Sequence, residues 1–235
     1  KINSNQTPKI VDDKNFSNFY VKLNKENRIK ASIDDSEYSD ADVVFVCSNC
    51  DFDFAKNKVN LTTYIKNIDQ ISKKTSDAPF GTQLKSKDYA ESGIPVIQGR
   101  NIKENKFHWN NKKYTSKEKF DSLPRSHCSK GDLIFPKIGT IGNVCILPSI
   151  EGNEQCILST NSMSCSINEK LADPNYIYYY FCQKKIHDYI NSTSRGSTQP
   201  IFNYGMLKAF SIEIPSLEIQ LKVSKILQEL DSKIE

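Results

Sequence analysis

The segment 130–144, Lys-Gly-Asp-Leu-Ile-Phe-Pro-Lys-Ile-Gly-Thr-Ile-Gly-Asn-Val, constrains the fold of this chain more than any other segment does. It reads as a turn, a buried strand at 133–135, a basic loop with two glycines, and the start of a second strand. Glycine lets a backbone approach its ligand closely, so a loop of this kind suits contact with a phosphate backbone or with base edges. The segment therefore predicts a sheet-containing domain with a loop that can face a polyanion.

Other segments predict a mixture of strands and helices. Strands are expected at 42–47, within 89–102, where 94–97 is bracketed by glycines, and at 143–147, 155–158, 162–167 and 209–214 within 206–215. A loop is expected over 49–58. Helices are expected at 62–74, near 116–122, at 174–191 with Asp173 as N-cap, and at 216–235. This mixed order predicts an α+β domain with a mixed β-sheet, followed by a long C-terminal helix.

Three parts are expected along the chain. Residues 1–60 are polar and form a small N-terminal extension or the tail of a preceding domain; residues 61–215 form the main domain; and residues 216–235 form the helix. That helix is amphipathic, with an apolar stripe of Ile219, Val223, Ile226, Leu227, Leu230 and Ile234. The stripe either packs on its own domain or begins a coiled coil that pairs two copies into a homodimer.

Charge and cysteine content indicate which class of partner the chain binds and in which redox compartment it works. Residues 1–60 hold nine basic and ten acidic side chains, which leaves 23 basic and 18 acidic in residues 61–235, a net charge of +5. This excess fits a polyanion, although surface lysines that serve solubility look the same. The seven cysteines, odd in number and without a secretory signal before them, indicate reduced thiols in a cytoplasm. Cys47 and Cys50 have metal-binding spacing but lack a second pair, and no apolar run is long enough to span a membrane.

Enzymatic motifs are missing from the sequence. It contains no dinucleotide or nucleotide phosphate loop, no adenine-methylase Asn-Pro-Pro-Tyr pocket, no His-Glu-x-x-His and no Gly-x-Ser-x-Gly elbow. We therefore expect no catalytic residue and no metal ligand in this chain.

Three groups of polar residues are candidates for contact with DNA, because lysine, arginine and small donors meet phosphates while arginine, asparagine and glutamine pair with base edges. They are Lys137, Thr140 and Asn143 on the glycine loop; Arg195, Ser197, Thr198, Gln199 and Asn203 after the 174–191 helix; and Arg100 with Asn101 at a strand end. Each group also has an ordinary structural interpretation, as a solvated hairpin turn, a helix-exit loop or a hydrogen-bonded brace. The aromatic residues at 107, 109 and 114 and His108 are interpreted as core more readily than as base-stacking platforms.

Four segments in this order resemble the target-recognition domain of the specificity subunits of type I restriction–modification systems. They are residues 80–102, with Phe-Gly-Thr-Gln-Leu-Lys, Tyr89 and Gly-Ile-Pro-Val-Ile-Gln-Gly-Arg-Asn-Ile; residues 131–144; Arg-Gly-Ser-Thr-Gln-Pro-Ile-Phe-Asn at 195–203 with Leu207 and Lys208; and Ile-Glu-Ile-Pro-Ser-Leu-Glu-Ile-Gln at 212–220. Together they span about residues 64–235. The sequence departs from the family's pattern in three ways. It has one recognition domain where such subunits carry two, residues 1–60 do not match the family, and the loop at 136–138 has less arginine than the family often has there.

The resemblance implies a non-catalytic module that reads one half of a bipartite site in double-stranded DNA. It implies methyltransferase subunits as partners and, through them, restriction subunits; S-adenosylmethionine, ATP and magnesium would belong to those partners, and no cofactor to this chain. The helix at 216–235 then resembles the start of the conserved spacer. Two alternatives stay open: the recognition domain of a fused restriction–methyltransferase enzyme, and a protein-interaction module that uses the terminal helix.

Overall fold

The computed structural model describes residues 51–53, 58–60, 64–79, 81, 83–193 and 200–234, all within one compact unit, Cys47–Glu235. The strand predicted at 42–47 and the Cys47–Cys50 pair lie outside the described residues. Strands β1 (Asp51–Asp53) and β2 (Lys58–Asn60) pair antiparallel, so the prediction of a loop over 49–58 was wrong at residues 51–53 and 58.

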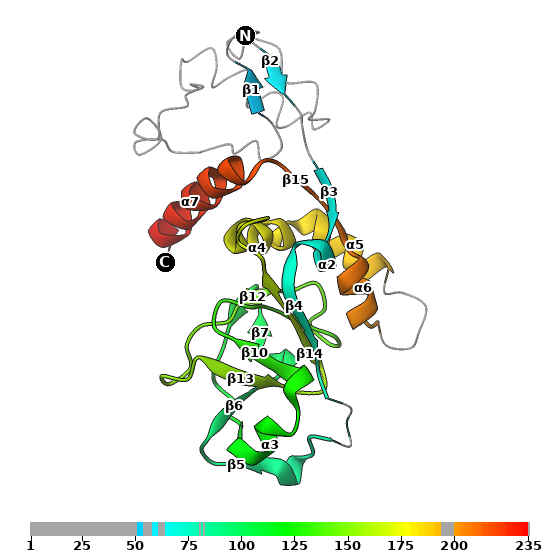
Figure 1. Ribbon diagram of the computed structural model, residues 1–235, viewed down its shortest axis with the longest axis vertical. Coiled ribbons are helices and arrows are strands. Elements are labelled where there is room, and N and C mark those ends of the chain that lie inside the picture. The colour runs from blue at the N-terminus through cyan, green and yellow to red at the C-terminus, as the bar shows by residue number, and fades with distance from the viewer. Residues whose placement is uncertain are drawn as a thin grey trace. The chain divides into compact units, whose positions relative to one another are not determined.

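Two sheets form the centre of the domain (Figure 1). The first has five strands in the order β10 (His127–Ser129), β13 (Gln155–Leu158), β6 (Ile94–Ile97), β9 (Tyr114–Thr115) and β5 (Tyr89–Ala90). The second has four strands in the order β12 (Cys145–Ile146), β11 (Leu133–Pro136), β14 (Ser162–Ile167) and β4 (Ser72–Asp77). Among these pairs only β13 and β6 run parallel. The five-stranded sheet is therefore mixed and the four-stranded sheet is antiparallel, which agrees with the predicted α+β fold.

Apolar residues from both sheets share one core. A single buried cluster contains Ile97, Ile102, Cys128, Ile134, Cys145, Leu147, Ile150, Cys156 and Leu158. All four residues of β11 are buried, which is why its sequence is a continuous apolar run and not an alternating one. The prediction of strands at 133–135, 155–158 and 162–167 is confirmed.

The longer helices lie in the C-terminal part of the chain. The predicted 174–191 helix is two helices, α4 (Pro174–Cys182) and α5 (Lys184–Thr193), because Gln183 between them is extended. The carboxylate of Asp173 accepts a hydrogen bond from Tyr176 N at 2.7 Å, as expected of an N-cap. The predicted helix near 116–122 is α3 (Lys117–Asp121), capped by Ser116. The chain also makes the 3-10 turns η2 (Ser86–Asp88), η3 (Gly99–Asn101) and η4 (Pro124–Ser126).

One prediction of local structure was wrong, and a second was right only in part. Residues 64–77 are not one helix but strand β3 (Tyr64–Asn67), the single turn α2 (Ile68–Ile71) and strand β4. Their isoleucines do not share a face, because Ile68 and Ile71 are buried while Ile65 is 70% exposed. Within 206–215 the chain forms helix α6 (Tyr204–Ala209) before strand β15 (Ser211–Ile214), which pairs with β3. Pairing with a strand distant in sequence decided the first case over local periodicity.

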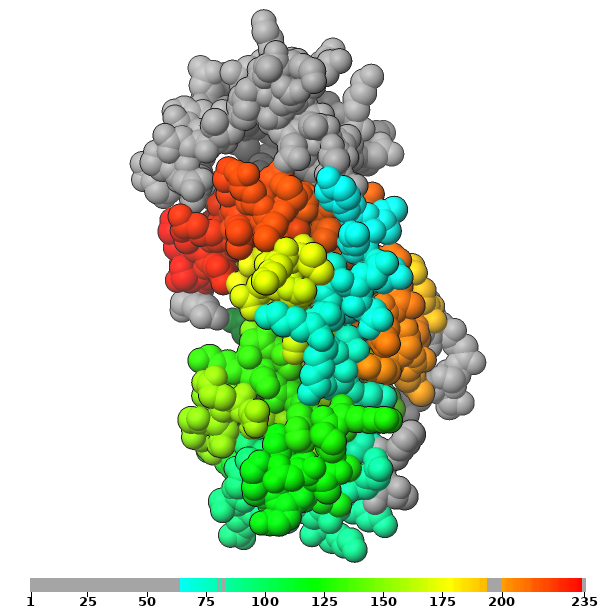
Figure 2. Space-filling model, in the orientation of Figure 1, coloured from blue at the N-terminus to red at the C-terminus, as the bar shows by residue number. Residues whose placement is uncertain are grey.

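Helix α7 (Leu217–Ile234) confirms the predicted C-terminal helix and packs on α4 (Figures 1 and 2), and the Tyr179 hydroxyl of α4 donates to Asp231 Oδ2 in its last turn at 2.8 Å. The Gln220 side chain joins these elements, since its Oε1 accepts from Asp173 N at 3.0 Å and its Nε2 donates to Pro215 O at 2.9 Å. The buried face of α7 is therefore partly polar: Gln220, Val223 and Ser224 are buried, whereas Ile219, Ile226, Leu227 and Leu230 are half-buried. Of the helices in the described ranges, none has the length and apolar character needed to cross a bilayer.

Candidate nucleic-acid interface

The carboxyl end of β11 brings two of the candidate segments together. Lys137, the first residue after the strand, donates its backbone N–H to Asn161 O at 2.9 Å and accepts at its carbonyl from Phe202 N at 3.0 Å. Phe202 follows the 195–200 segment and is 1% exposed. The glycine loop and the end of the 195–203 segment, far apart in sequence, are thus neighbours in the fold.

The third candidate segment reaches the same place. Gly99 in η3 packs so tightly here that an added Cβ would lie 2.8 Å from Asn161 O and 3.4 Å from Pro136 Cβ. Glycine is required at position 99 for this close approach rather than for an unusual backbone angle. The turn that carries Arg100 and Asn101 therefore lies against the end of β11, and all three segments meet there.

Lys137 is the cation at this junction, and its charge is compensated inside the protein. Its Nζ lies 2.8 Å from Asp77 Oδ1, at the end of β4, and the Lys137 side chain is only 19% exposed. The same Asp77 oxygen accepts from Ala78 N at 2.9 Å, which fixes the carboxylate. Contact between Lys137 and DNA stays a prediction, and it would place Asp77 in competition with the phosphate.

Thr140 and Asn143 hold the glycine loop against a neighbouring hairpin, β7 (Ile102–Lys103) and β8 (Lys106–Phe107). Thr140 Oγ1 donates to Ile102 O at 3.0 Å, and Asn143 Oδ1 accepts from Asn105 N at 3.0 Å. Asn105 Oδ1 accepts a hydrogen bond from Val144 N at 3.1 Å, and the Asn105 carbonyl accepts one from the Tyr178 hydroxyl at 3.0 Å. These side chains brace the loop, so any contact that they make with DNA remains a prediction beside an observed structural role.

The other side of the loop lies against α5. Gly142 has φ +86°, and an added Cβ would be 2.6 Å from His187 Cδ2 and 3.1 Å from Asn191 Nδ2. Gly139 has a similar φ of +83° but open space around it. The two glycines thus share a backbone requirement and differ in their surroundings.

This difference predicts unequal costs for two matched substitutions. Gly139→Ala should lower the free energy of unfolding by about 1 kcal/mol through the positive φ alone, and Gly142→Ala by about 2–3 kcal/mol because the methyl group also meets α5. Urea unfolding followed by circular dichroism measures both values. Adding His187→Ala to Gly142→Ala should recover part of the excess, and equal costs for the two glycines would contradict the packing of the loop on α5.

Arg100 and Asn101 have different surroundings although they are adjacent. Asn101 is 1% exposed; its Oδ1 accepts from Gln98 N at 2.8 Å and its Nδ2 donates to His108 O at 2.8 Å, so it acts as a brace. Arg100 is exposed, and its Nε donates to Gln98 Oε1 at 2.6 Å. Of this pair, Arg100 is the residue that a ligand can reach.

The four polar candidates Arg195, Ser197, Thr198 and Gln199 lie outside the described residues, and their DNA contacts stay predictions. The residues that flank them do meet the glycine loop, since Asn191 Nδ2 donates to Ile141 O at 3.5 Å on one side and Phe202 bonds Lys137 on the other. Asn203 is exposed and caps α6, where its Oδ1 accepts from Met206 N at 3.0 Å. Sequence reasoning missed Asp77, Asn105 and Asn161, and only their positions in short polar turns beside strands could have indicated them.

Aromatic and thiol groups near the site are structural. Trp109 stacks on Phe107 at 6.0 Å and meets the edge of Tyr114 at 5.8 Å, beside the shared core. Cys128, Cys145, Cys156, Cys165 and Cys182 are free, as predicted for reduced thiols. In the part of the chain that the structure describes, no group of three or more His, Cys, Asp or Glu side chains is arranged to hold a metal ion.

The family model of the type I restriction modification DNA specificity domain matches residues 65–235, and the chain belongs to that family. The resemblance read from the sequence is therefore confirmed, and a DNA specificity domain agrees with the prediction of a non-catalytic chain. A Methanocaldococcus jannaschii protein, assigned as the MjaX specificity subunit of a type I restriction enzyme, is 27% identical over 146 residues, which are 60% of this chain and 34% of that protein.

Two solved structures share the fold. One comes from work on complex assembly and conformational transition of the type I R-M system; it has a TM-score of 0.54 and 15% identity, and the match covers 78% of this chain and 42% of that chain. The other is the HsdS subunit from Thermoanaerobacter tengcongensis, with a TM-score of 0.51, 16% identity and coverage of 73% and 38%. The α+β prediction is confirmed, and the chain spans less than half the length of these relatives.

Proposed function

We propose that this chain is the DNA-reading part of a type I restriction–modification specificity subunit, which recognises double-stranded DNA through the surface at the carboxyl end of β11. The observation that carries the proposal is the convergence there of three polar segments from residues 99–101, 137–143 and 200–203, in a chain that belongs to the DNA specificity family. Phosphate contacts would give affinity and register, and side chains at base edges would give specificity.

The proposal extends to the partners and the cofactors. Helix α7 would start the spacer that docks methyltransferase subunits, and restriction subunits would join through them. S-adenosylmethionine, ATP and magnesium would be held by those subunits in a bacterial or archaeal cytoplasm. The assignment of the Methanocaldococcus jannaschii relative as a specificity subunit favours a separate subunit over a recognition domain fused to a methyltransferase. A homodimer through α7 is a further part of the proposal.

Duplex binding gives the direct test, with a pair of substitutions of opposite expected sign. Lys137→Ala should weaken binding several-fold, whereas Asp77→Asn should strengthen it, because Asp77 compensates the Lys137 charge at 2.8 Å and asparagine keeps the acceptor for Ala78 N. Arg195→Ala should weaken binding as well. Fluorescence anisotropy with labelled duplexes at several salt concentrations measures all three.

The biological readout is methylation mapping of the parent genome with and without the gene. Loss of one adenine-methylated motif on deletion is expected and would also name the sequence that is read. An unchanged methylation pattern, together with duplex binding that ignores sequence and salt, would refute the proposed function. Unchanged specific binding in both the Lys137 and the Arg195 variants would refute these two site assignments and leave the function standing.

A further inference from the structure

A shallow hollow lies beside the candidate interface and shares Arg100 with it. Its volume is about 400 Å³. It is lined by Ser86, Tyr89, Ala90, Glu91, Arg100 and Lys113. These residues come from η2, from β5 and the turn after it, from η3, and from the segment before β9, so three distant parts of the chain form it.

The guanidinium of Arg100 is held in place at this hollow. Gln98, which is only 8% exposed, accepts the Arg100 Nε–H at 2.6 Å, and the backbone of Gln98 is fixed by Asn101 Oδ1 at 2.8 Å. Within the described ranges no carboxylate pairs with Arg100, so its two terminal nitrogens keep their donors. A cation that is already oriented loses little side-chain entropy when it binds an anion.

Lys113 is the second cation, and it is half-buried. Its backbone carbonyl accepts from Val96 N at 2.7 Å, which anchors the residue beside β6. No described carboxylate lies within ion-pair distance of its ammonium group, whereas the adjacent Lys112 pairs with Glu151 at 2.5 Å and Lys119 pairs with Asp88 at 3.6 Å. Lys112 and Lys119 are thus compensated by carboxylates, and Arg100 and Lys113 are not paired with any described carboxylate.

One acid also lines the hollow. Glu91 is exposed and would repel an anion there, but two cations against one carboxylate leave the hollow with a net positive charge. The hydroxyl of Ser86 adds a neutral donor. The lining therefore fits a singly charged oxyanion with several oxygen acceptors.

We infer that this hollow binds a phosphate of the DNA backbone outside the bases that are read. The inference rests on the proposed function and adds a contact to it: η3 lies against the end of β11, so a duplex on the candidate interface continues onto Arg100 and Lys113. A guanidinium matches phosphate oxygens in a bidentate way, and the lysine supplies a point charge. The contact contributes affinity without sequence information, because every phosphate is alike.

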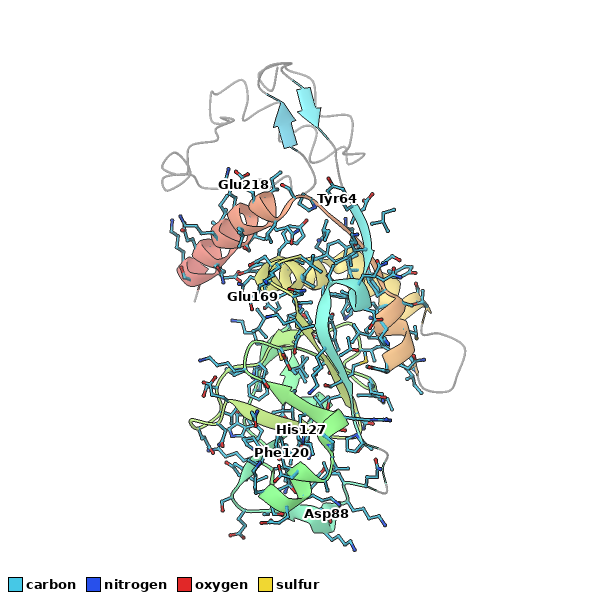
Figure 3. All side chains as sticks on the ribbon, viewed as in Figure 1. Tyr64, Asp88, Phe120, His127, Glu169 and Glu218 are labelled. Carbon is cyan, nitrogen blue, oxygen red and sulfur yellow. The ribbon has the colours of Figure 1, made fainter. Side chains whose placement is uncertain are left out.

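The test uses the full chain and a fluorescein-labelled duplex of random sequence, which reports phosphate contacts and needs no knowledge of the target. Arg100→Ala and Lys113→Ala should each weaken binding by about three- to tenfold near 0.1 M salt and should each lower the slope of log affinity against log salt by about 0.9. Glu91→Gln should strengthen binding, a gain that partial unfolding cannot imitate. Lys73→Ala is the matched control, since Lys73 pairs with Glu169 at 3.3 Å and Glu169 lies well away from the end of the sheets marked by Asp88 (Figure 3).

The possible outcomes distinguish failure of the proposed phosphate site from failure of the proposed DNA recognition. Weaker binding by both alanine variants and tighter binding by Glu91→Gln, with Lys73→Ala unchanged and all melting temperatures alike, supports the phosphate site. Wild-type binding that depends on salt but is unaffected in affinity and slope by Arg100→Ala and Lys113→Ala overturns the hollow and leaves the proposed function intact. Absence of salt-dependent duplex binding by the wild-type chain overturns both.

Discussion

Replacing Phe202 with alanine should lower the free energy of unfolding by about 3–5 kcal/mol, the range for deleting a fully buried phenylalanine. The ring is 1% exposed and lies 6.4 Å from the rings of Phe135 and Phe210, each at a steep angle. Phe135 belongs to β11 and Phe210 precedes β15, so Phe202 joins the four-stranded sheet to the α6–β15 region. Removing the ring leaves a cavity between the four-stranded sheet and the α6–β15 region.

Ile201→Ala is the matched control, because Ile201 is 40% exposed and sits next to Phe202 in the sequence. Its cost should stay within about 0.5 kcal/mol, as for most surface substitutions. Both backbones keep the hydrogen bond from residue 202 N to Lys137 O, so the difference isolates the ring. Urea denaturation followed by circular dichroism gives both values. A Phe202→Ala cost as small as that of Ile201→Ala would mean that the segment is not anchored beside the glycine loop.

Strands buried on both faces were the most predictable part of this fold. The segments predicted as strands at 133–135 and 155–158 are short and mainly apolar, whereas 162–167 alternates serine with apolar residues; all three are bounded by turn residues and form β11, β13 and β14. The cap of α4 was equally predictable, since Asp173 begins this helix through a local hydrogen bond, and Ser116 caps α3 in the same local way. In each case the information lies within a few residues of the element.

Elements whose state depends on distant partners were not predictable. Residues 64–67 become β3 because β15, more than 140 residues later, supplies the paired strand, as the bond from Ser211 Oγ to Asn67 Oδ1 illustrates. The break at Gln183 and the helix at 204–209 were not predicted either, although the Asn203 side chain that caps the second is a local signal. Periodicity describes one face of a segment and says nothing about what will cover it.

The candidate site shows the same division between local and distant information. Sequence reasoning selected the segments that meet at the end of β11, but it did not predict that Lys137 pairs with Asp77, 60 residues earlier, or that Thr140 and Asn143 brace a hairpin. Residue types that suit DNA contact also suit internal hydrogen bonds, and a single sequence does not separate the two uses. Arg100 and Lys113 emerge as accessible cations only once their surroundings are known.

The second large effect concerns alkaline pH. Burial raises the pKa of Cys156 and of Cys182 to about 12, and it also raises the pKa values of Cys128, Cys145 and Cys165. A group whose pKa is higher in the folded state stabilises the fold fully below its unfolded pKa, here about 9. That stabilisation is lost as the pH rises from the unfolded value toward the folded one, because the unfolded chain releases the proton first. Each thiol contributes a slope of about 1.4 kcal/mol per pH unit in this window.

Stability should therefore be insensitive to these thiols below about pH 8 and should fall steeply above about pH 9, by several kcal/mol per pH unit when five thiols act together. Urea unfolding at a series of pH values from about 8 upward through the range above about 9 measures the slope. Cys165→Ala should reduce the slope above pH 9 by about one proton, or about 1.4 kcal/mol per pH unit, whatever the substitution costs at neutral pH. Lys73→Ala, at an exposed ion pair, should leave the slope due to thiols unchanged. A slope that Cys165→Ala does not alter would show that this thiol is accessible to water in the folded protein, contrary to its 0% exposure.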